Sequence, residues 1–484
     1  MSKKLARPVF QGVFTLVLIV FANASFLLAQ TPVDLSVKFD RGDFHQVAVQ
    51  FEHKGVVIVD HAGQDDDAQV LPLDVIAKLK YAQRFTGAKG DLQAIRFFEG
   101  SGADIEIDEG ETDSKLSETN RLIVARINPN SKQRLQMASI SDVLDQRELE
   151  LIRNPADPLS FTRMFRRADA KVGDKWKVKA EYIADFLAVD HVFENNLEIV
   201  LKSLTDGIAK LYVVGSVKAE VDDVTTDLEI SSIALINVKD HYLKTLRTTI
   251  REDRSPGQVA PGFKGQTKID LKMTPTAGKI ELSNEALSRA NSKKIERRLK
   301  WETDEGDFRV IYDPRWRIIA SESEATVMRF LDQGQLLAQC NIVQLDRRPP
   351  NNPLKLAQFK KEIEKIIEAE DSAEVVKAQE LKTRNKLRAL RLVVDGIEDR
   401  IPIKWIYYHV AHDDGRRLTF VFTLEQSVAS QFDIADKLLV NETTFKPGKT
   451  PKNETAKSEK SSSDSAPEAR SSRKSDANAA EKKR

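Results

Sequence analysis

The chain has 484 residues, with 75 Lys and Arg against 74 Asp and Glu, so its formal net charge is only +1. This balance argues against a dedicated nucleic-acid binder, which would carry a strongly basic domain. The single Cys excludes a disulfide framework and any metal site that needs several thiolates. At roughly 150 residues per domain, the length predicts two or three domains.

The first residues have the order of a secretory signal peptide. A basic stretch precedes the apolar run Val13–Phe21, and the small tripeptide Ala22-Asn23-Ala24 follows. We predict a signal peptide over residues 1–24, cleaved after Ala24, and hence a secreted or periplasmic protein. Cleavage after Ala29 and retention as an uncleaved anchor are the alternatives. No later window is apolar enough to span a membrane, so no span is expected after cleavage. The basic residues are Lys3, Lys4 and Arg7.

Residues 31–283 are predicted to form a β-rich domain with one large antiparallel sheet, because short alternating or β-branched runs are joined by polar turns. Two segments are predicted to be helical, Leu71–Phe85 and Ser139–Arg153, the second with Ser141 or Asp142 as its N-cap. The expected strands are residues 44–51, 55–59, 122–127, 176–180, 197–201, 209–217, 225–236 and 242–251.

Two connecting segments follow. Ser255–Gly265 is rich in Pro and Gly and lacks the spacing of a phosphate-binding loop, so we expect a plain connector. Residues 284–300 are predicted to form a charged helix or linker. Its basic residues either offer a patch to an anionic surface or simply face water. The lack of interleaved aromatic residues favours the solvated face.

Residues 301–446 are predicted to form an α+β domain, with helices packed against a second antiparallel sheet. A group of prolines introduces a helix at residues 354–369, and a closing helix is expected at 428–440. The pair Asp414-Gly415 is a strong hairpin signal between the last two long strands. The expected strands are residues 308–312, 317–320, 325–331, 336–345, 387–394, 401–411 and 418–424.

Several side chains of this second domain are expected in its core. Cys340 lies in an apolar strand and is predicted to be a buried, unreactive thiol. Trp316 is predicted to point inward, and Tyr407 and Tyr408 to point to opposite faces of their strand. The closing helix is expected to bury Phe432, Ala435, Leu438 and Leu439.

The order of five segments in this domain is informative: Tyr312–Arg317, a strand that includes Cys340-Asn341-Ile342, a helix around Phe359, the strand around Trp405–Tyr408, and Gly415–Phe420. In this order the domain resembles the α/β/α sandwich of the photosystem extrinsic protein PsbP and its secreted bacterial relatives. The resemblance implies a non-enzymatic domain that docks to partners, and it carries over no functional residue. The N-terminal region more distantly resembles the curved sheets of envelope lipoprotein carriers.

The composition changes after Phe445. Pro447–Arg484 contains no Val, Ile, Leu, Phe, Tyr or Trp, so it cannot bury enough apolar surface to offset its ordering entropy and is predicted to be disordered. It carries ten basic and six acidic residues. This basic tail motivates the hypothesis that it tethers the protein to an anionic envelope polymer.

The best metal-site candidate is His409, His412 and Asp413, because imidazole and carboxylate groups are typical zinc ligands. On a strand, however, residues three apart point to opposite faces, so His412 would have to lie in the turn. The alternative is a histidine at a hairpin end beside solvated acids. We favour the second interpretation.

Other motifs fail to specify chemistry. Asp104, Glu106 and Asp108 resemble the start of a calcium loop, but a Glu stands where the loop needs Gly, so an exposed strand face is expected. Gly100-x-Gly102 lacks the third glycine of a dinucleotide loop. We find no nucleophile-elbow or zincin motif, and we expect no cofactor.

The sequence therefore predicts an exported protein without catalysis that binds a partner protein or an apolar ligand on a concave sheet or in an interdomain cleft. A metal-assisted hydrolase that uses His409, His412 and Asp413 is the rival hypothesis. A structural protein tethered to the envelope through its tail is the third.

Overall fold

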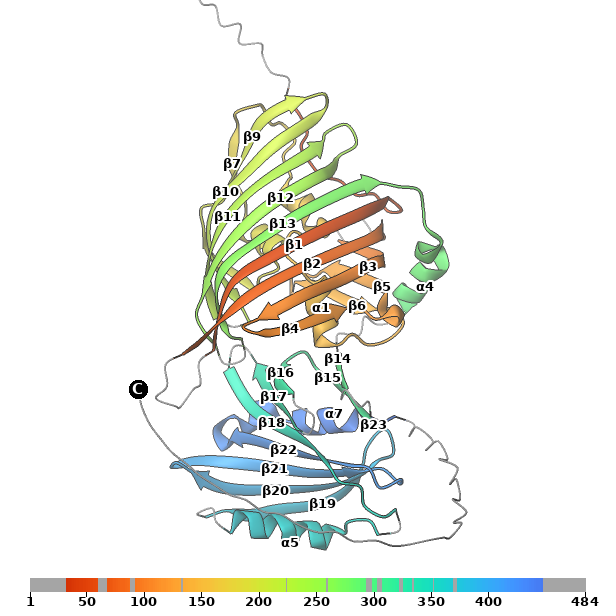
Figure 1. Ribbon diagram of the computed structural model, residues 1–484, viewed down its shortest axis with the longest axis vertical. Coiled ribbons are helices and arrows are strands. Elements are labelled where there is room, and N and C mark those ends of the chain that lie inside the picture. The colour runs from red at the N-terminus through yellow and green to blue at the C-terminus, as the bar shows by residue number, and fades with distance from the viewer. Residues whose placement is uncertain are drawn as a thin grey trace, which may run out of the picture. The chain divides into compact units, whose positions relative to one another are not determined.

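The computed structural model describes most of residues 32–446, which belong to one compact unit, and its strands form three antiparallel sheets (Figure 1). The predicted signal peptide and the predicted tail lie outside the described residues. Also left undescribed are residues 60–67, 88–91, 132–133, 223, 258–259, 293–297, 303–306, 322–324, 333–334, 351 and 369–371.

The first sheet has 13 strands among the described residues, and its main path is β6-β5-β3-β2-β1-β13-β12-β11-β10-β9-β7, with β4 beside β3 and β8 beside β10. The strands are β1 (Phe44–Val59), β2 (Gln69–Phe85), β3 (Gln93–Ile107), β4 (Gly110–Lys115), β5 (Leu122–Ile127), β6 (Leu135–Ser139), β7 (Lys175–Lys177), β8 (His191–Asn195), β9 (Glu198–Thr205), β10 (Ile208–Val221), β11 (Val224–Asn237), β12 (Tyr242–Arg254) and β13 (Gly262–Pro275).

Alternation along the strands gives this sheet two different faces. In β11, Leu228 and Ile230 are buried, whereas Asp227 and Glu229 are exposed. Successive side chains on a strand point to opposite faces, so the apolar residues form one face and the charged residues the other. We call these the inner and the outer face. The predicted large antiparallel sheet is confirmed, with strands longer than the sequence runs indicated.

Three short helices pack on the inner face: α1 (Gln146–Ile152), α2 (Phe161–Met164) and α3 (Ala180–Leu187). Their apolar residues share one buried cluster with the inner residues of β1, β2 and β10. Buried ion pairs fix the same segment: Arg96 of β3 binds both carboxylate oxygens of Asp157, at 2.6 and 2.7 Å. Arg134 and Arg163 bind the two oxygens of buried Asp185. The inner face is therefore filled by the protein's own side chains.

The two helices predicted in this region need correction. Leu71–Phe85 is not helical, because it lies in β2, where the side chains of Ala77, Leu79 and Tyr81 are buried on alternate positions. Pairing with β1 and β3 over its length outweighs its local helical character. The helix predicted at Ser139–Arg153 is shorter and starts after Asp145, whose side chain and that of Glu148 form a capping box.

The predicted connector Ser255–Gly265 is loop only in part, since β13 begins at Gly262. Gly265 pairs with Gly55 of β1, and a Cβ on either glycine would lie 2.4 Å from a carbonyl oxygen of the neighbouring strand. Glycine is thus required for this close approach of two backbones. The ring of Phe263 stacks on His53 at 4.1 Å beside this pair.

The predicted charged segment 284–300 begins as the helix α4 (Asn284–Ser292). It is not solvated on all sides, because Ala286, Leu287 and Ala290 pack with Ala82 and other residues of the first sheet. Its basic residues from 293 to 297 lie outside the described residues, so the choice between anionic patch and solvated face stays a prediction.

The predicted second domain contains the other two sheets among the described residues, in the orders β14-β15-β23 and β16-β17-β18-β22-β21-β20-β19. Helix α5 (Leu356–Ile367) packs on one face of the seven-stranded sheet, and α6 (Ala429–Phe432) and α7 (Ala435–Asn441) lie on the other (Figure 1). The predicted α+β class is thus seen in this region, although strands dominate the chain. The strands are β14 (Leu299–Glu302), β15 (Phe308–Tyr312), β16 (Trp316–Ser321), β17 (Ala325–Asp332), β18 (Gln335–Leu345), β19 (Glu374–Lys382), β20 (Arg388–Glu398), β21 (Ile401–Ala411), β22 (Arg417–Glu425) and β23 (Thr443–Phe445).

The predicted core of this region is confirmed with one exception. Cys340 and Trp316 are buried, and burial raises the pKa of the Cys340 thiol. The closing helix is broken into α6 and α7 at Asp433, whose φ is 48°. In α7, Leu439 is buried whereas Leu438 is 53% exposed.

Candidate functional site

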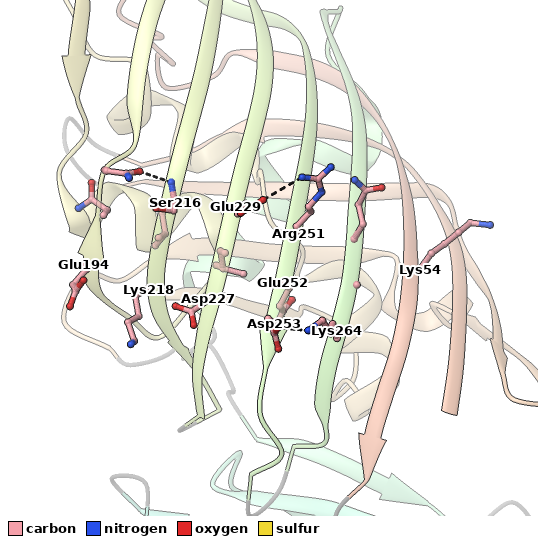
Figure 2. A pocket seen from close by; sticks show the side chains of 16 residues that line it. Lys54, Glu194, Ser216, Lys218, Asp227, Glu229, Arg251, Glu252, Asp253 and Lys264 are labelled. Atoms are coloured by element: carbon pink, nitrogen blue, oxygen red, sulfur yellow. Dashed lines mark hydrogen bonds and ion pairs between the residues drawn. The ribbon is translucent and has the colours of Figure 1, made fainter. Parts of the chain in front are cut away.

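The outer face of the first sheet carries a hollow of about 960 Å³, which we call the polar groove. Its walls are side chains of β8, β10, β11, β12 and β13 together with Lys54 of β1 (Figure 2). The lining is mixed in charge, so the groove suits a partner that is itself polar. The charged lining residues are Lys54, Glu194, Lys218, Asp227, Glu229, Arg251, Glu252, Asp253 and Lys264.

Strand register sets the charge pattern of the groove. Glu229 of β11 lies opposite Arg251 of β12, and their side chains form an ion pair at 3.3 Å. Asp253 lies opposite Lys264 of β13, with an ion pair at 2.8 Å. Both pairs appear as dashed lines in Figure 2. Opposite charges on neighbouring strands hold one another in place and remain exposed to solvent.

One rim of the groove depends on a backbone feature. Gly215 of β10 has a φ of +151°, and a side chain there would approach the Cα of Leu197 to 2.8 Å. This leaves room for Asn196, whose Oδ1 accepts a hydrogen bond from the backbone N–H of Ser216 at 2.6 Å. The rim is therefore shaped by a glycine and an asparagine that the sequence analysis did not identify.

Carboxylates raise the pKa of two lysines of the groove. The pKa of Lys264 is raised by its hydrogen bond with Asp253, and the pKa of Lys54 is raised by its hydrogen bond with Asp74. Burial raises the pKa of Glu252, but this side chain bonds Thr226 and lies near Arg254. By strand alternation, Glu252 belongs to the inner face, next to the groove rather than on its outer-face floor.

A second hollow, of about 750 Å³, lies further along β1, β12 and β13 and extends over β2 and β3. It is lined by Lys78 and Lys80 of β2, Arg247 of β12 and Lys272 of β13, together with apolar residues such as Ile76. Register places Glu52, Thr249 and Lys268 side by side between the two hollows. The outer face thus presents two successive hollows along one set of strands.

The structure separates the three predicted metal ligands. His409 is buried, and its ring packs against Phe359 of α5 at 5.9 Å. His412 lies in the turn, with its Nδ1 3.0 Å from Asp414 and its ring near Phe445. Asp413 is exposed. No group of three or more His, Cys, Asp or Glu that could hold a metal occurs among the residues the structure describes. The metal site therefore has no geometric support and stays a prediction.

The acidic motif and the Gly100-x-Gly102 motif both lie in or next to strand β3. Asp104 and Glu106 are exposed residues of β3, and Asp108 lies in the turn that follows, with a φ of 55°. Gly100 and Gly102 are also strand residues of β3, not part of a loop before a helix. The exposed strand face predicted for the acidic motif is confirmed for Asp104 and Glu106.

Sequence reasoning missed the groove residues. Their only signal is the alternation of charged residues with apolar ones in β10, β11, β12 and β13. Alternation indicates a solvent face. It does not indicate which stretch of that face is hollowed, because this depends on which strands become neighbours.

Comparisons with known proteins give no family. No family model matches the chain, and no curated protein matches it. Among solved structures, it is similar to cyanobacterial PsbP (CyanoP) from Synechocystis, with 12% identity and a TM-score of 0.25 over 31% of this chain and 92% of that chain. It is also similar to LpqN, involved in cell envelope biogenesis of Mycobacterium tuberculosis, with 11% identity and a TM-score of 0.23 over 31% of this chain and 93% of that one.

A third similar structure is the immunity protein TplEi of the T6SS from Pseudomonas aeruginosa, with 10% identity and a TM-score of 0.21 over 45% of this chain and 74% of that one. The resemblance to PsbP predicted from the sequence is found again in these matches, at low structural similarity. TM-scores this low do not establish a function, so none is taken from these proteins. Among the described helices, none has the length and apolar character needed to cross a bilayer.

Proposed function

We propose that this chain is an exported, non-catalytic binding protein that recognises a polar segment of a partner protein along the outer face of its first sheet. The observation that carries the proposal is the polar groove, a hollow of about 960 Å³ lined by charges of both signs. A partner segment with alternating charges would meet complementary groups across several neighbouring strands.

The support of the groove favours binding by a rigid surface. Its side chains stand on long strands whose inner face is filled, so the backbone from which they project is held in place. Recognition is more precise on strands than on loops. The same filled inner face gives no support to an apolar ligand held on a concave sheet.

The chemistry of the groove favours binding over catalysis. A general base or acid works best with a pKa near neutrality. The pKa values of Lys54 and Lys264 are shifted upward, away from neutrality. The carboxyl of Glu252, whose pKa is raised, is bonded to Thr226 of the neighbouring strand.

The test is photo-crosslinking of the exported protein in its native host. A photoreactive amino acid at Gln266, in the groove, should give one discrete protein adduct. The exchange pair Glu229→Arg with Arg251→Glu keeps an ion pair in the fold but inverts the charges that the partner meets. We expect the adduct to fall at least tenfold in this variant.

Matched controls use the exposed helix α5. The photoreactive amino acid at Lys361 should give no such adduct. The exchange Lys360→Glu with Glu364→Lys inverts an exposed ion pair of 3.4 Å outside the groove and should leave the adduct at Gln266 unchanged. Equal adducts from positions 266 and 361, or an adduct insensitive to the groove exchange, would contradict the proposal.

Two rival functions stay open to direct tests. A metal-assisted hydrolase requires stoichiometric zinc in the purified protein, lost in His412→Ala, and elemental analysis decides this. An envelope tether requires that deletion of residues 447–484 releases the protein into the soluble fraction at low salt. The interdomain cleft also stays a prediction.

A further inference from the structure

A cluster of basic side chains gathers at one end of the seven-stranded sheet, away from the polar groove. His409 of β21 is paired with Leu390 and Thr419 on the flanking strands. Two residues on, Ala411 is paired with Arg388 and Arg417. Residues two apart on a strand, and their cross-strand partners, share a face. Arg388 and Arg417 therefore flank Ala411 on the same face as His409, which is the face that α5 covers in part.

A third arginine, Arg348, lies beside the turn that precedes Arg417, and this turn requires a glycine. The backbone N–H of Arg348 donates to the carbonyl oxygen of Gly415 at 3.0 Å. Gly415 has a φ of +91°, and a Cβ there would lie 1.9 Å from the carbonyl oxygen of Arg348. Any side chain at position 415 would push Arg348 away. Burial, and then the charge of Arg348, lower the pKa of Arg417.

Two polar atoms of this cluster are buried without a hydrogen-bond partner among the described residues: Nε2 of His409 and Nη1 of Arg348. His409 is only 3% exposed, and its ring is packed against Phe359. Buried polar atoms in folded proteins are normally hydrogen-bonded, so an unpartnered pair in one cluster needs an explanation. Burial, with the charges of the three arginines, lowers the pKa of His409 to about 4.

Among the three arginines of the cluster, Arg388 has a carboxylate partner, whereas Arg348 and Arg417 have none among the described residues. Arg388 is bound by Glu380 and by the carbonyl oxygen of Leu354. Arg417 donates to the backbone carbonyl of Asp346, while the carboxylates of Glu362 and Asp346 act on it only through space. Neither Arg348 nor Arg417 forms an ion pair with an acidic residue that the structure describes. Both residues are partly exposed, so a ligand can approach them from solvent.

We propose that Arg348, Arg417 and His409 form a binding site for an oxyanion of the phosphate class. Two guanidinium groups present several N–H donors in the planar geometry that suits phosphate oxygens. The imidazole adds a donor through Nε2 in the appropriate tautomer. A doubly charged oxyanion would occupy the unpartnered donors and relieve the repulsion between the two arginines.

The direct test is calorimetric titration of the full mature chain with inorganic phosphate, at constant ionic strength set by chloride. We expect saturable binding with one site, weakened at least tenfold in Arg348→Gln with Arg417→Gln. The matched control is Lys361→Gln with Lys365→Gln, which removes the same charge from exposed positions of α5. It should bind phosphate as the unchanged protein does.

Two further variants separate a binding role from a structural one. Arg417→Lys keeps the charge but loses the fork of donors, and should bind several-fold more weakly. In the folded protein, phosphate should raise the pKa of the His409 ring, followed by nuclear magnetic resonance, and Gly415→Ala should reduce this shift. The proposal is overturned if the unchanged protein does not bind phosphate, if the arginine variant binds equally well, or if the His409 signal does not respond.

The source of the phosphate group is distinguished by a second arm with lipid vesicles. If phosphate binds and vesicles of phosphatidylglycerol, but not of phosphatidylcholine, retain the protein through Arg348 and Arg417, the ligand is a lipid headgroup. If phosphate binds and neither vesicle retains it, the ligand is a free or small-molecule phosphate. Either result supports the site, because both require phosphate binding at these residues.

Discussion

The two large sheets of this chain differ in how their faces are used. The first sheet buries its inner face under α1, α2 and α3 and leaves most of its outer face to solvent. The seven-stranded sheet has helices on both faces, α5 on one and α6 with α7 on the other. A sheet covered on one side can offer a broad binding surface. A sheet covered on both sides leaves ligands only its ends and its uncovered strands.

The difference also appears in where charges are buried. In the first sheet, buried arginines hold the covering helices in place, as Arg96 does with Asp157. In the seven-stranded sheet, Asp436 of α7 accepts hydrogen bonds from Arg391 and Tyr408. Both networks join a helix to a sheet by a charge that is costly to leave unpaired. In the polar groove, by contrast, the pairs Glu229–Arg251 and Asp253–Lys264 are exposed, so these side chains can serve recognition.

The largest expected effect comes from breaking a buried pair under the first sheet. Arg96→Ala leaves the Asp157 carboxylate buried and without its bidentate partner. We expect the free energy of unfolding to fall by about 3–5 kcal/mol, measured by urea denaturation. The control is Arg121→Ala, which breaks an exposed pair with Glu118. It should lower the free energy of unfolding by less than about 1 kcal/mol. Equal losses in the two variants would show that Arg96 does not anchor the inner face.

Neighbouring leucines of α7 test the cover of the seven-stranded sheet. Leu439 is buried, so Leu439→Ala should lower the free energy of unfolding by about 2–5 kcal/mol through the cavity that it creates. Leu438 is 53% exposed, and Leu438→Ala should change the free energy of unfolding by less than about 0.5 kcal/mol. Similar losses from the two variants, in thermal or urea unfolding, would mean that both leucines are buried, as the sequence predicted for an unbroken helix.

Acid pH should weaken both regions through one histidine each. Burial lowers the pKa of His53 and of His409 from 6.5 to about 4. The unfolded chain therefore takes up a proton at a higher pH than the native chain, and stability is lost as the pH falls from 6.5 to 4. We expect His409 to lower the free energy of unfolding by about 3 kcal/mol over this window. The loss through the less buried His53 should be somewhat smaller.

The measurement for this pH effect is the free energy of unfolding at several pH values, compared with His409→Gln and His53→Gln. Each variant should flatten the dependence on pH between 6.5 and 4. A variant whose stability falls with pH as steeply as that of the unchanged protein would exclude its histidine as the cause.

The smallest effect on stability is expected on the outer face. Arg251→Ala removes an exposed pair with Glu229 and should change the free energy of unfolding by less than about 0.5 kcal/mol. The same change should reduce the adduct at Gln266 several-fold, because it removes a charge that the partner meets. A large loss of stability without loss of the adduct would reverse the roles assigned to the two faces.

The sequence by itself determined the β-rich first region, the α+β character of the second and the inward position of Trp316 and Cys340. Alternation and composition act locally, so they are visible in one dimension. The hairpin at Asp414-Gly415 is a further example, because its turn chemistry is contained in two residues.

Only the tertiary structure decided the rest. Leu71–Phe85 became a strand because β1 and β3 lie on either side of it, and the closing helix broke at Asp433 because the chain turns there with a positive φ. The groove joins residues of β8 and β10–β13 with Lys54 of β1, and the arginine cluster joins Arg348 to Arg417 through Gly415. Sites of this kind arise from pairings between distant segments, whose register no local pattern records.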